Sequence, residues 1–277
     1  MKLCVYMSKN ISKTIVKSPL RYPGGKSRAV KILFQYIPKN TKELCSPFFG
    51  GGSFEIYCAQ AGIMVYGYDN FKPLVDFWQY LLEDPEKLAD QVETHYPLPR
   101  AKFYEYQKLQ FESRSKLERA TLFYVLNRTS FSGSTLSGGM ASGGLHDNPR
   151  FNKSSIERLR KFKIENLTVE LADFKESIRK HKSTLLYLDP PYMIKNKLYG
   201  HRGDLHKDFD HTGLFEILKK RRGWILSYNN SDEIKDLYSN FYIETPATWT
   251  YGMSTNKSPR EVVILSDDIA KHIESTK

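Results

Sequence analysis

Residues 44–69, LCSPFFGGGSFEIYCAQAGIMVYGYD, decide the fold. The apolar run at 44–48 is typical of a short buried strand, and the glycines of 49–53 end it. Residues 54–61 have a helical pattern, and a second apolar run at 63–68 ends in Asp69. Two buried strands joined by a crossover helix predict a parallel sheet, and therefore an α/β fold.

Outward from this unit the pattern changes twice. Residues 85–127 have helical periodicity, and the run of Gly and Ser at 130–144 predicts a loop or loose hairpin that cannot bury a core. A helical pattern near 213–220 accompanies further strand-like segments at 167–171, 184–188, 224–228, 241–244 and 261–265. We expect a Rossmann-like sheet made by residues 1–81 and 166–277, with a mainly helical insert at 82–165.

Composition indicates a globular chain. Of 277 residues, 26% are charged and 40% are hydrophobic, which excludes bulk disorder. No apolar run is long enough to cross a membrane, and the first ten residues lack the features of a signal peptide. Cys4, Cys45 and Cys58 have no Cys-x-x-Cys spacing, which indicates reduced thiols. We expect a soluble cytoplasmic protein, or one inside a host cell if its source is a phage or virus.

The net charge is +11, and residues 95–164 carry +8 of it. Residues 95–164 contain 13 Lys and Arg against 5 Asp and Glu, interleaved with aromatic side chains. This distribution fits a surface that binds nucleic-acid phosphates, and it equally fits a set of solvated helix faces. Both interpretations stay open on composition alone.

The segment RYPGGKS at 21–27 ends like a phosphate-binding loop, but its spacing excludes one. That loop requires a glycine at position 20, which is Leu20. Gly24 and Gly25 then form either a plain turn or a flexible turn that lets Lys26 approach a ligand.

The glycines at 50–52 differ from the dinucleotide fingerprint. Glu55 stands where that fingerprint has its third glycine after Gly50 and Gly52. Asp69 ends the next strand, where a carboxylate would bind ribose hydroxyls. These features indicate a cofactor with a nucleoside but without a diphosphate, its polar tail at the helix N-terminus.

The strongest signal is LYLDPPY at 186–192, an apolar strand followed by Asp-Pro-Pro-Tyr. Both prolines fix φ and lack an N–H, so the loop is rigid and its carbonyl oxygens are available to a ligand. Ligands of α/β sheets bind at the carboxyl ends of the strands. The motif therefore favours a functional site over a simple end to the strand.

These motifs, in this order, resemble the Dam-like DNA adenine-N6 methyltransferases of the D12 class, with the alpha-type order of motifs. The family's Gly-Gly-Lys segment is matched at 22–26, and its Pro-Phe-x-Gly-x-Gly-Ser segment at 47–53. LNRTSFSG at 126–133 resembles the Asn-Arg segment of its target-recognition insert, and ADF at 172–174 resembles its pocket for the cofactor adenine. The resemblance implies a methyltransferase sheet, S-adenosylmethionine as methyl donor and a site-specific transfer to double-stranded DNA.

The resemblance also assigns residues to roles. Those implied for catalysis are Asp189, Pro190, Pro191 and Tyr192. Those implied for cofactor binding are Tyr22, Gly25, Lys26, Pro47, Phe48, Gly50, Gly52, Ser53, Asp69, Asn70, Asp173, Phe174 and Asp189. Those implied for DNA binding are Asn127, Arg128, Ser130, Ser132, Lys161 and Lys163.

The chemistry expected of the catalytic motif follows from the weakness of the acceptor. An adenine amino nitrogen is a poor nucleophile because its lone pair is delocalised into the ring. Asp189 and the Pro190 carbonyl would accept its N–H bonds, and Tyr192 would stack on an adenine flipped out of the duplex. Stacking needs only the ring, so Tyr192→Phe is expected to be tolerated. Direct displacement requires alignment, and neither a covalent nucleophile nor a metal.

The family resemblance implies that the insert reads a short adenine-containing palindrome such as GATC or CATG. Lys161 and Lys163 would contact phosphates, whereas Arg128 and the residues of 130–144 would approach base edges. Arg128 has an alternative role, which is only to support the loop. A cognate restriction endonuclease is a candidate partner, and we expect a monomer or weak dimer with no membrane association.

Other functions have weaker support. Amino-group methylation of cytosine N4, or of a base in RNA, stays open because related Pro-Pro motifs serve those acceptors. A cytosine-C5 methyltransferase needs a cysteine, typically after proline, and no cysteine here follows one. The Glu-Ile-Lys tripeptide at 233–235 has the form of a nuclease motif but is short and lies in a predicted surface helix. His201, His206 and His211 recur every five residues, which fits neither a helix face nor a strand face and favours surface positions over a metal site.

Overall fold

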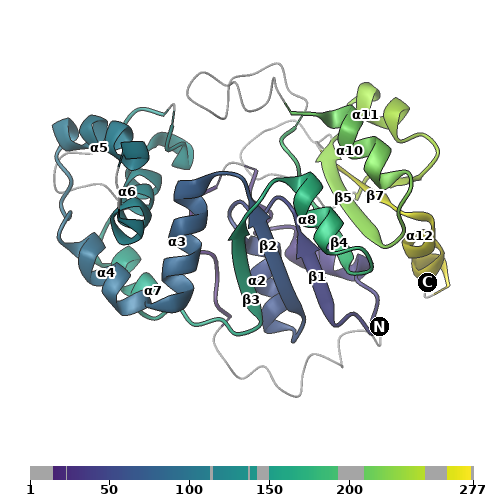
Figure 1. The fold of residues 1–277 in the computed structure, drawn as a ribbon, viewed down its shortest axis with the longest axis horizontal. Helices are drawn as coiled ribbons and strands as arrows, with labels where there is room; N and C mark the ends of the chain where they lie inside the picture. The colour runs from purple at the N-terminus through teal and green to yellow at the C-terminus, as the bar shows by residue number, and fades with distance from the viewer. Residues whose placement is uncertain are drawn as a thin grey trace.

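A computed structural model describes residues 15–22, 24–112, 115–136, 138–141, 150–192, 209–246 and 261–275 (Figure 1). These residues form a seven-stranded sheet with the order β3-β2-β1-β4-β5-β7-β6. Its strands are β1 (Glu43–Ser46), β2 (Met64–Asp69), β3 (Leu167–Leu171), β4 (Leu185–Leu188), β5 (Trp224–Asn229), β6 (Tyr242–Glu244) and β7 (Glu261–Leu265). The strands from β3 across to β5 are parallel, whereas β7 runs antiparallel between β5 and β6.

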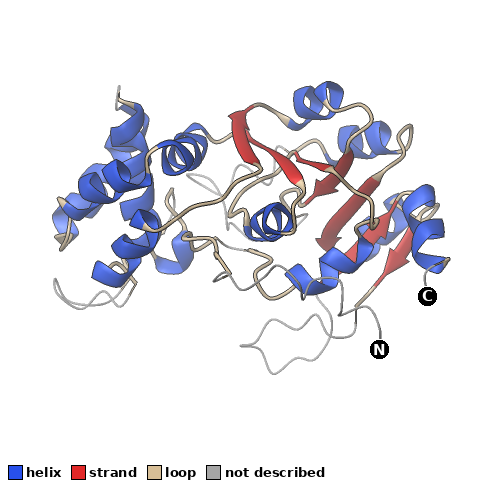
Figure 2. Ribbon diagram, turned by 90° about the horizontal axis from the view of Figure 1, so that it is seen from below, coloured by secondary structure: helices blue, strands red, loops and turns tan. Residues whose placement is uncertain are grey.

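Helices cover both faces of the sheet and gather beside its β3 edge (Figures 1 and 2). Those of the two segments that carry the sheet are α1 (Val30–Leu33), α2 (Ser53–Gln60), α3 (Lys72–Glu83), α8 (Phe174–Lys180), α10 (His211–Leu218), α11 (Asp232–Leu237) and α12 (Asp267–Glu274). Those between the segments are α4 (Pro85–Glu93), α5 (Arg100–Glu112), α6 (Lys116–Thr129) and α7 (Lys153–Arg160). Short 3-10 turns, η1 (Phe34–Tyr36) and η2 (Phe131–Gly133), complete the described structure.

The central strands are apolar on both faces because helices bury both. Successive side chains of a strand point to opposite faces of the sheet. On β4, Tyr187 packs in the core that contains α1, α2 and α12, whereas Leu186 and Leu188 pack with α8, α10 and α11. A parallel sheet buried in this way has nearly continuous apolar strands, as the sequence shows.

The predicted α/β fold is confirmed. The strands expected at 167–171 and 261–265 have the observed bounds of β3 and β7. The helix expected at 213–220 begins earlier, at His211, because the Asp210 carboxylate accepts the Gly213 N–H and caps it. The sequence analysis did not identify α3, nor the antiparallel direction of β7.

Helix α3 connects the sheet to the helical part of the chain. It crosses the predicted boundary between residues 81 and 82, and it is buried on two sides. Phe77 stacks on Tyr124 of α6 with ring centroids 5.5 Å apart, whereas Trp78 meets Phe49 edge to face at 5.2 Å. One hydrophobic core therefore extends from the sheet to α4, α6 and α7. The gathering of these helices beside β3 is consistent with the predicted insert, whose bounds stay a prediction.

Gly67 of β2 offers a test of this packing. A Cβ added at Gly67 would overlap the ring of Phe49, which packs against Trp78. We expect Gly67→Ala to lower the free energy of unfolding by roughly 1–3 kcal/mol, the usual cost of overpacking a core. Urea unfolding measures the change. Gly139→Ala is the control, because among the described residues its added Cβ would have only the Tyr104 hydroxyl within 4 Å, at 3.9 Å. Equal stability of the two variants would contradict the prediction.

Candidate active site

The glycine-rich turn between β1 and α2 lies at the carboxyl ends of the strands. Gly50 and Gly52 have φ values of +48° and +63°, which favour glycine. Gly50 N–H donates to Asp69 Oδ2 at 3.0 Å, and Trp78 Nε1 donates to the Gly50 carbonyl oxygen at 2.9 Å. A Cβ on Gly50 would stand 2.9 Å from the Tyr22 ring. The turn therefore packs against the segment that leads to Lys26.

Asp69 ends β2 and faces this turn. Its Oδ1 accepts the Phe71 N–H at 2.9 Å, while its Oδ2 accepts that of Gly50. Burial raises the pKa of Asp69, and the backbone donors oppose the change. Each carboxylate oxygen has two lone pairs, so Asp69 has capacity for ribose hydroxyls as well.

Three aromatic rings meet beside the turn. Phe48 and Phe174 stack with centroids 5.7 Å apart, and Phe209 lies 5.5 and 5.3 Å from them. Asp173 orients Phe174 by accepting two backbone N–H groups as the N-cap of α8. All three rings are half-buried, so they present an apolar surface suited to a purine.

The other residues predicted for the cofactor are near these groups in the chain. Their exposure differs, since Pro47 is buried, Gly25 and Ser53 are half-buried, and Asn70 is exposed. Ser53 is the first residue of α2, at the helix N-terminus where a polar tail was expected.

Lys26 is buried against the Asp-Pro-Pro-Tyr motif. Its Nζ donates to both carboxylate oxygens of Asp189 at 2.7 Å and to the Tyr192 hydroxyl at 2.8 Å. The same Nζ donates to the Gly24 carbonyl at 3.0 Å and lies 3.6 Å from Glu261 Oε1. The Lys26 and Glu261 side chains are each 3% exposed, and that of Asp189 is 22% exposed. The structure thus brings a residue predicted for the cofactor onto the predicted catalytic carboxylate.

Asp189 is held from a second side by β5. Ser227 Oγ donates to Asp189 Oδ1 at 2.9 Å, and the Tyr187 hydroxyl lies 3.3 Å from Ser227 Oγ. Pro190 is buried and Pro191 is half-buried, and neither has an N–H that would need an acceptor. The carboxylate is thereby fixed in orientation while part of it stays accessible.

Tyr192 is held by both its hydroxyl and its ring. The hydroxyl accepts from Lys26 and donates to Glu261 Oε1 at 2.7 Å. The ring stacks on Tyr228 with centroids 6.0 Å apart, and Lys26 Nζ is 5.1 Å from its centre. The expectation that Tyr192→Phe is tolerated was based only on stacking by the ring. Loss of the hydroxyl would remove a hydrogen-bond partner from two buried charged groups.

Glu55 of α2 is a further buried carboxyl whose charge couples to Asp189 and Lys26. It is 3% exposed, and its Oε1 accepts from Ser46 Oγ at 2.7 Å. Burial raises the pKa of Glu55 to about 7, with a smaller contribution from Asp189 and opposition from the Ser46 hydrogen bond. The group therefore titrates near neutral pH.

Asn127 and Arg128 of α6 bind the protein's own backbone. Asn127 accepts the Arg21 N–H at 2.9 Å and donates to the Arg21 carbonyl at 2.7 Å. Arg128 donates to the carbonyl oxygens of Arg150 at 2.8 Å and Pro19 at 3.3 Å. Asn127 is 1% exposed and Arg128 is 7% exposed. This geometry disagrees with base readout and supports the alternative in which Arg128 holds neighbouring loops.

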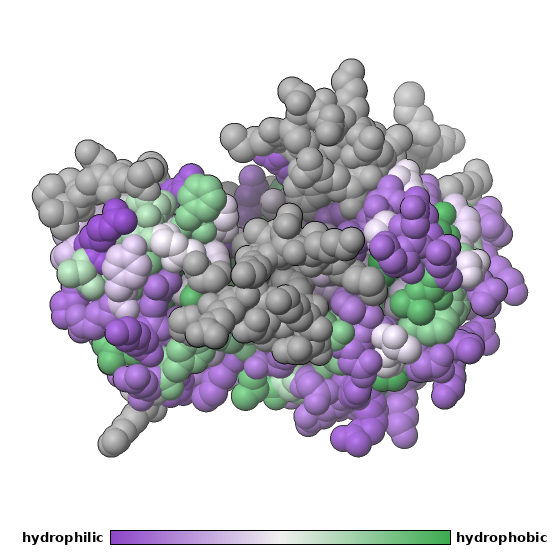
Figure 3. Space-filling model, turned by 90° about the horizontal axis from the view of Figure 1, so that it is seen from above, coloured by the Kyte–Doolittle hydropathy of each residue, from purple (hydrophilic) through white to green (hydrophobic). Residues whose placement is uncertain are grey.

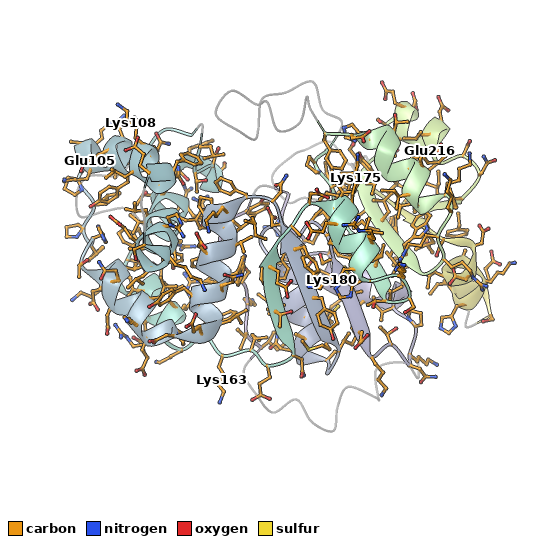
Figure 4. All side chains as sticks on the ribbon, viewed as in Figure 1. Glu105, Lys108, Lys163, Lys175, Lys180 and Glu216 are labelled. Carbon is orange, nitrogen blue, oxygen red and sulfur yellow. The ribbon has the colours of Figure 1, made fainter. Side chains whose placement is uncertain are left out.

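Lys161 and Lys163 lie at the edge where the parallel strands begin. They stand between the end of α7 and the start of β3, and Lys163 points away from the fold there (Figure 4). Lys161 pairs with Glu157 at 3.0 Å. The length of β3 separates this edge from the strand ends by about 15 Å. The placement argues against the predicted contacts with a duplex bound at Asp189.

Ser130 and Ser132 belong to the Gly/Ser run, whose described part forms a loose hairpin, as expected. Ser130 bridges Met140, and Gln107 of α5 donates to two carbonyl oxygens of the hairpin. Ser130 is buried, whereas Ser132 is exposed and has a φ of +55°. Phe131 between them is 67% exposed, which leaves an aromatic ring in solvent beside the hairpin.

The remaining candidates give no further site. His211 Nδ1 bonds to the Tyr228 hydroxyl, whereas His201 and His206 lie outside the described residues. The Glu-Ile-Lys tripeptide lies in α11, in the helix that was expected. Among the described residues, no three or more His, Cys, Asp or Glu side chains are grouped to hold a metal. In the same part of the chain, no helix has both the length and the apolar character needed to cross a membrane.

A comparison of the sequence with models of known protein families identifies one that matches this chain. The model of the D12 class N6 adenine-specific DNA methyltransferases matches residues 22–251. The chain belongs to this family. The resemblance drawn from the motifs is thereby confirmed, together with the methyltransferase type of its sheet.

Two curated relatives of this D12-family chain are, by name, a modification methylase and a type II methyltransferase. Modification methylase LlaI of Lactococcus lactis subsp. lactis is 24% identical over 218 residues, covering 73% of this chain and 34% of that protein. Type II methyltransferase M.MjaIII of Methanocaldococcus jannaschii is 24% identical over 262 residues, covering 83% of this chain and 90% of that protein. The chain thus spans about a third of the length of LlaI and most of M.MjaIII.

Three residues of the site were not identified from the sequence, namely Glu55, Ser227 and Glu261. Glu261 opens the strand EVVIL, and Ser227 interrupts the strand WILSYN. A polar side chain in a buried apolar strand must find a partner, so this pattern is a usable signal. The sequence drew attention to Glu55 only because it stands where the dinucleotide fingerprint has its third glycine.

Glu55 makes the stability of the protein depend on pH. Its folded pKa of about 7 exceeds the ordinary 4.5, so its stabilising contribution is full below about pH 4.5 and is lost as pH rises through about 7. Through this group the free energy of unfolding should fall by about 3 kcal/mol over that range, whereas Glu55→Gln should not show the fall. Urea unfolding at several pH values measures it, with the exposed Glu274→Gln as control. Parallel pH profiles for Glu55→Gln and wild type would contradict the assignment.

Proposed function

We propose that this D12-family chain transfers a methyl group from S-adenosylmethionine to the N6 amino group of adenine in double-stranded DNA. The position of Asp189 carries the proposal. Its partly exposed carboxylate follows β4, with both oxygens on the buried Lys26 ammonium. The strand order reverses between β1 and β4, which is where open α/β sheets bind ligands.

Residues at the ends of β1, β2 and β3 fit S-adenosylmethionine. Asp69 would accept from the ribose hydroxyls, and Phe48 and Phe174 would contact the purine. Gly50, with its positive φ and close backbone packing, leaves no side chain between the turn and a ligand. When bound, the cofactor supplies a methyl group activated on a sulfonium sulfur. The incomplete dinucleotide fingerprint agrees with a nucleoside that carries no diphosphate.

The acceptor amine would be held by the catalytic motif. Asp189 and the Pro190 carbonyl would accept the two N–H bonds, which directs the nitrogen lone pair toward the methyl carbon. A carbon–nitrogen bond then forms as the carbon–sulfur bond breaks, and one amino proton leaves through Asp189. Lys26 fixes the plane of the carboxylate through two short hydrogen bonds, so alignment is built into the site before DNA binds.

Exposed aromatic and basic side chains support a DNA-binding surface near the hairpin. Phe131, Phe111 and Tyr104 are 67%, 52% and 44% exposed. On the face seen from above, such apolar areas are small and lie among hydrophilic ones (Figure 3). Aromatic rings in solvent suit stacking with the bases of an opened duplex. Lys108 of α5 is exposed at the same edge as the carboxyl ends of the strands (Figure 4).

The proposal includes a target sequence in DNA and a partner enzyme. We propose a short palindromic target such as GATC or CATG, as the family resemblance implies, with base flipping at the adenine. The names of both relatives, a modification methylase and a type II methyltransferase, fit a chain that works beside a restriction endonuclease.

Asp189→Asn tests the reaction. We expect wild-type protein, expressed in a host without DNA methylation of its own, to place N6-methyladenine at one short motif, detected by long-read sequencing. Asp189→Asn should reduce the rate of transfer by about 100-fold or more, because the carboxylate accepts from the amine in the transition state. Asp236→Asn, exposed on α11, is the control. Methylated cytosine N4, or modification of RNA alone, would overturn the proposal in favour of the other amino acceptors.

Lys108 and Lys163 test the side on which DNA binds. Lys108→Ala should weaken binding to every duplex and reduce the salt dependence by about one phosphate contact, because Lys108 lies at the site edge. Lys163→Ala should leave binding unchanged, because Lys163 lies at the opposite edge (Figure 4). Fluorescence anisotropy over a salt series measures both. The reverse result would restore the contacts that the sequence predicts and place the duplex elsewhere.

A further inference from the structure

We propose that Glu261 is a positioning residue for methyl transfer, one that holds Tyr192 and Lys26 so that Asp189 faces the acceptor amine. The inference rests on the proposed function, since it concerns the same site. Glu261 lies outside every motif identified in the sequence, and it reaches the site only because of the strand order.

The antiparallel direction of β7 brings Glu261 to the site. Glu261 is the first residue of β7 and pairs with Asn229, the last residue of β5. Parallel strands present their last residues at the site edge, and an antiparallel neighbour presents its first residue there. Glu261 therefore lies at the same edge as Asp189.

The contacts of Glu261 join two functional groups through one oxygen. Its Oε1 accepts the Tyr192 hydroxyl at 2.7 Å and lies 3.6 Å from Lys26 Nζ. The Tyr192 hydroxyl, in turn, accepts from Lys26 at 2.8 Å. The Tyr192 hydroxyl thus donates its proton to Glu261 and accepts from Lys26 through a lone pair.

The burial of Glu261 is costly without these partners. The residue is 2% exposed, and Val262, Val263, Ile264 and Leu265 after it are fully buried apolar side chains. A carboxylate in such a strand is tolerated only when it is paired and hydrogen-bonded. The partners that offset its cost are the two side chains that flank Asp189, which points to a role in the site.

Removal of Glu261 would change the site in two ways. The Tyr192 hydroxyl would lose the acceptor that fixes its proton, and the hydrogen bond from Lys26 would no longer be opposed by a bond to Glu261. The Lys26 ammonium would lose one of its two carboxylate neighbours, so its attraction to Asp189 would increase and would draw the Asp189 oxygens away from the amine. Both changes act on alignment, so they should slow transfer more than they weaken cofactor binding.

A double-mutant cycle with the full-length chain tests the proposal. The rate constant of single-turnover methyl transfer and the calorimetric Kd for S-adenosylmethionine are measured for Glu261→Gln, Glu261→Ala, Tyr192→Phe and the double variant Tyr192→Phe/Glu261→Ala. We expect Glu261→Ala to slow transfer at least tenfold with the Kd changed by less than about threefold. Glu261→Gln, which still accepts from the Tyr192 hydroxyl, should recover part of the rate. Relative to wild type, the double variant should lose less rate than the product of the two single losses.

The control is Glu244→Gln, a half-buried glutamate on the neighbouring strand β6, which should match wild type in both measurements. Wild-type rates in Glu261→Ala, or losses that multiply in the double variant, would overturn the inference. Should Glu261→Ala fail to fold, Glu261→Gln keeps the volume and one acceptor, and its cycle with Tyr192→Phe measures the same coupling.

A measurement without turnover separates the inference from the proposed function. The Gly25 and Ala29 amides bond to the Tyr22 and Lys26 carbonyls, so their hydrogen exchange reports the order of the Lys26 turn. Glu261→Gln should speed this exchange, and Glu244→Gln should not. If wild-type protein methylates no nucleic acid, the proposed function fails and the exchange result still decides whether Glu261 orders the turn. If wild type methylates DNA and Glu261→Gln leaves both exchange and rate unchanged, only the positioning role fails.

Discussion

The ion pair between a buried lysine ammonium and a partly exposed aspartate carboxylate constrains the rest of this structure. Lys26 Nζ is 2.7 Å from both oxygens of Asp189, and the Lys26 side chain is 3% exposed. Each charge alone in such a site would cost several kcal/mol of desolvation. Two contacts help to offset this desolvation. Ser227 of β5 donates to Asp189, and Glu261 of β7 lies near Lys26. The sheet must therefore have this strand order before the pair can be stable.

The same pair depends on the helical part of the chain. Two side chains of α6 hold the segment before Lys26 through its backbone. Asn127 bonds to Arg21, and Arg128 bonds to Pro19. Through α3, the core beneath α6 is continuous with the one beneath the glycine-rich turn. Helix α6 and the Lys26–Asp189 pair therefore share one packed framework, in which α6 is hydrogen-bonded to the segment that leads to Lys26.

The sequence is most informative where local chemistry is restrictive. The positive φ of Gly50 and Gly52 follows from the residues themselves, so the turn between β1 and α2 was correctly predicted. The role of the Asp-Pro-Pro-Tyr motif stays a prediction. The role of Arg128 could not be inferred, because an arginine that binds backbone carbonyls looks the same in sequence as one that binds a base. Glu261 was missed for another reason. Its place at the site depends on the antiparallel direction of β7, which no pattern within that strand encodes.

The position of β7 has a consequence for the time at which the enzyme becomes complete. The strand inserts between β5 and β6 although it follows both in the chain. During synthesis, β1 to β6 emerge first, and Lys26 and Asp189 are already present without Glu261. An elongating chain therefore lacks the carboxylate that accepts from Tyr192 and lies near Lys26 until β7 leaves the ribosome and pairs with β5. Assembly of this hydrogen-bonded cluster is therefore coupled to the pairing of β7, so a partly made chain has Lys26, Asp189 and Tyr192 without the buried carboxylate of Glu261.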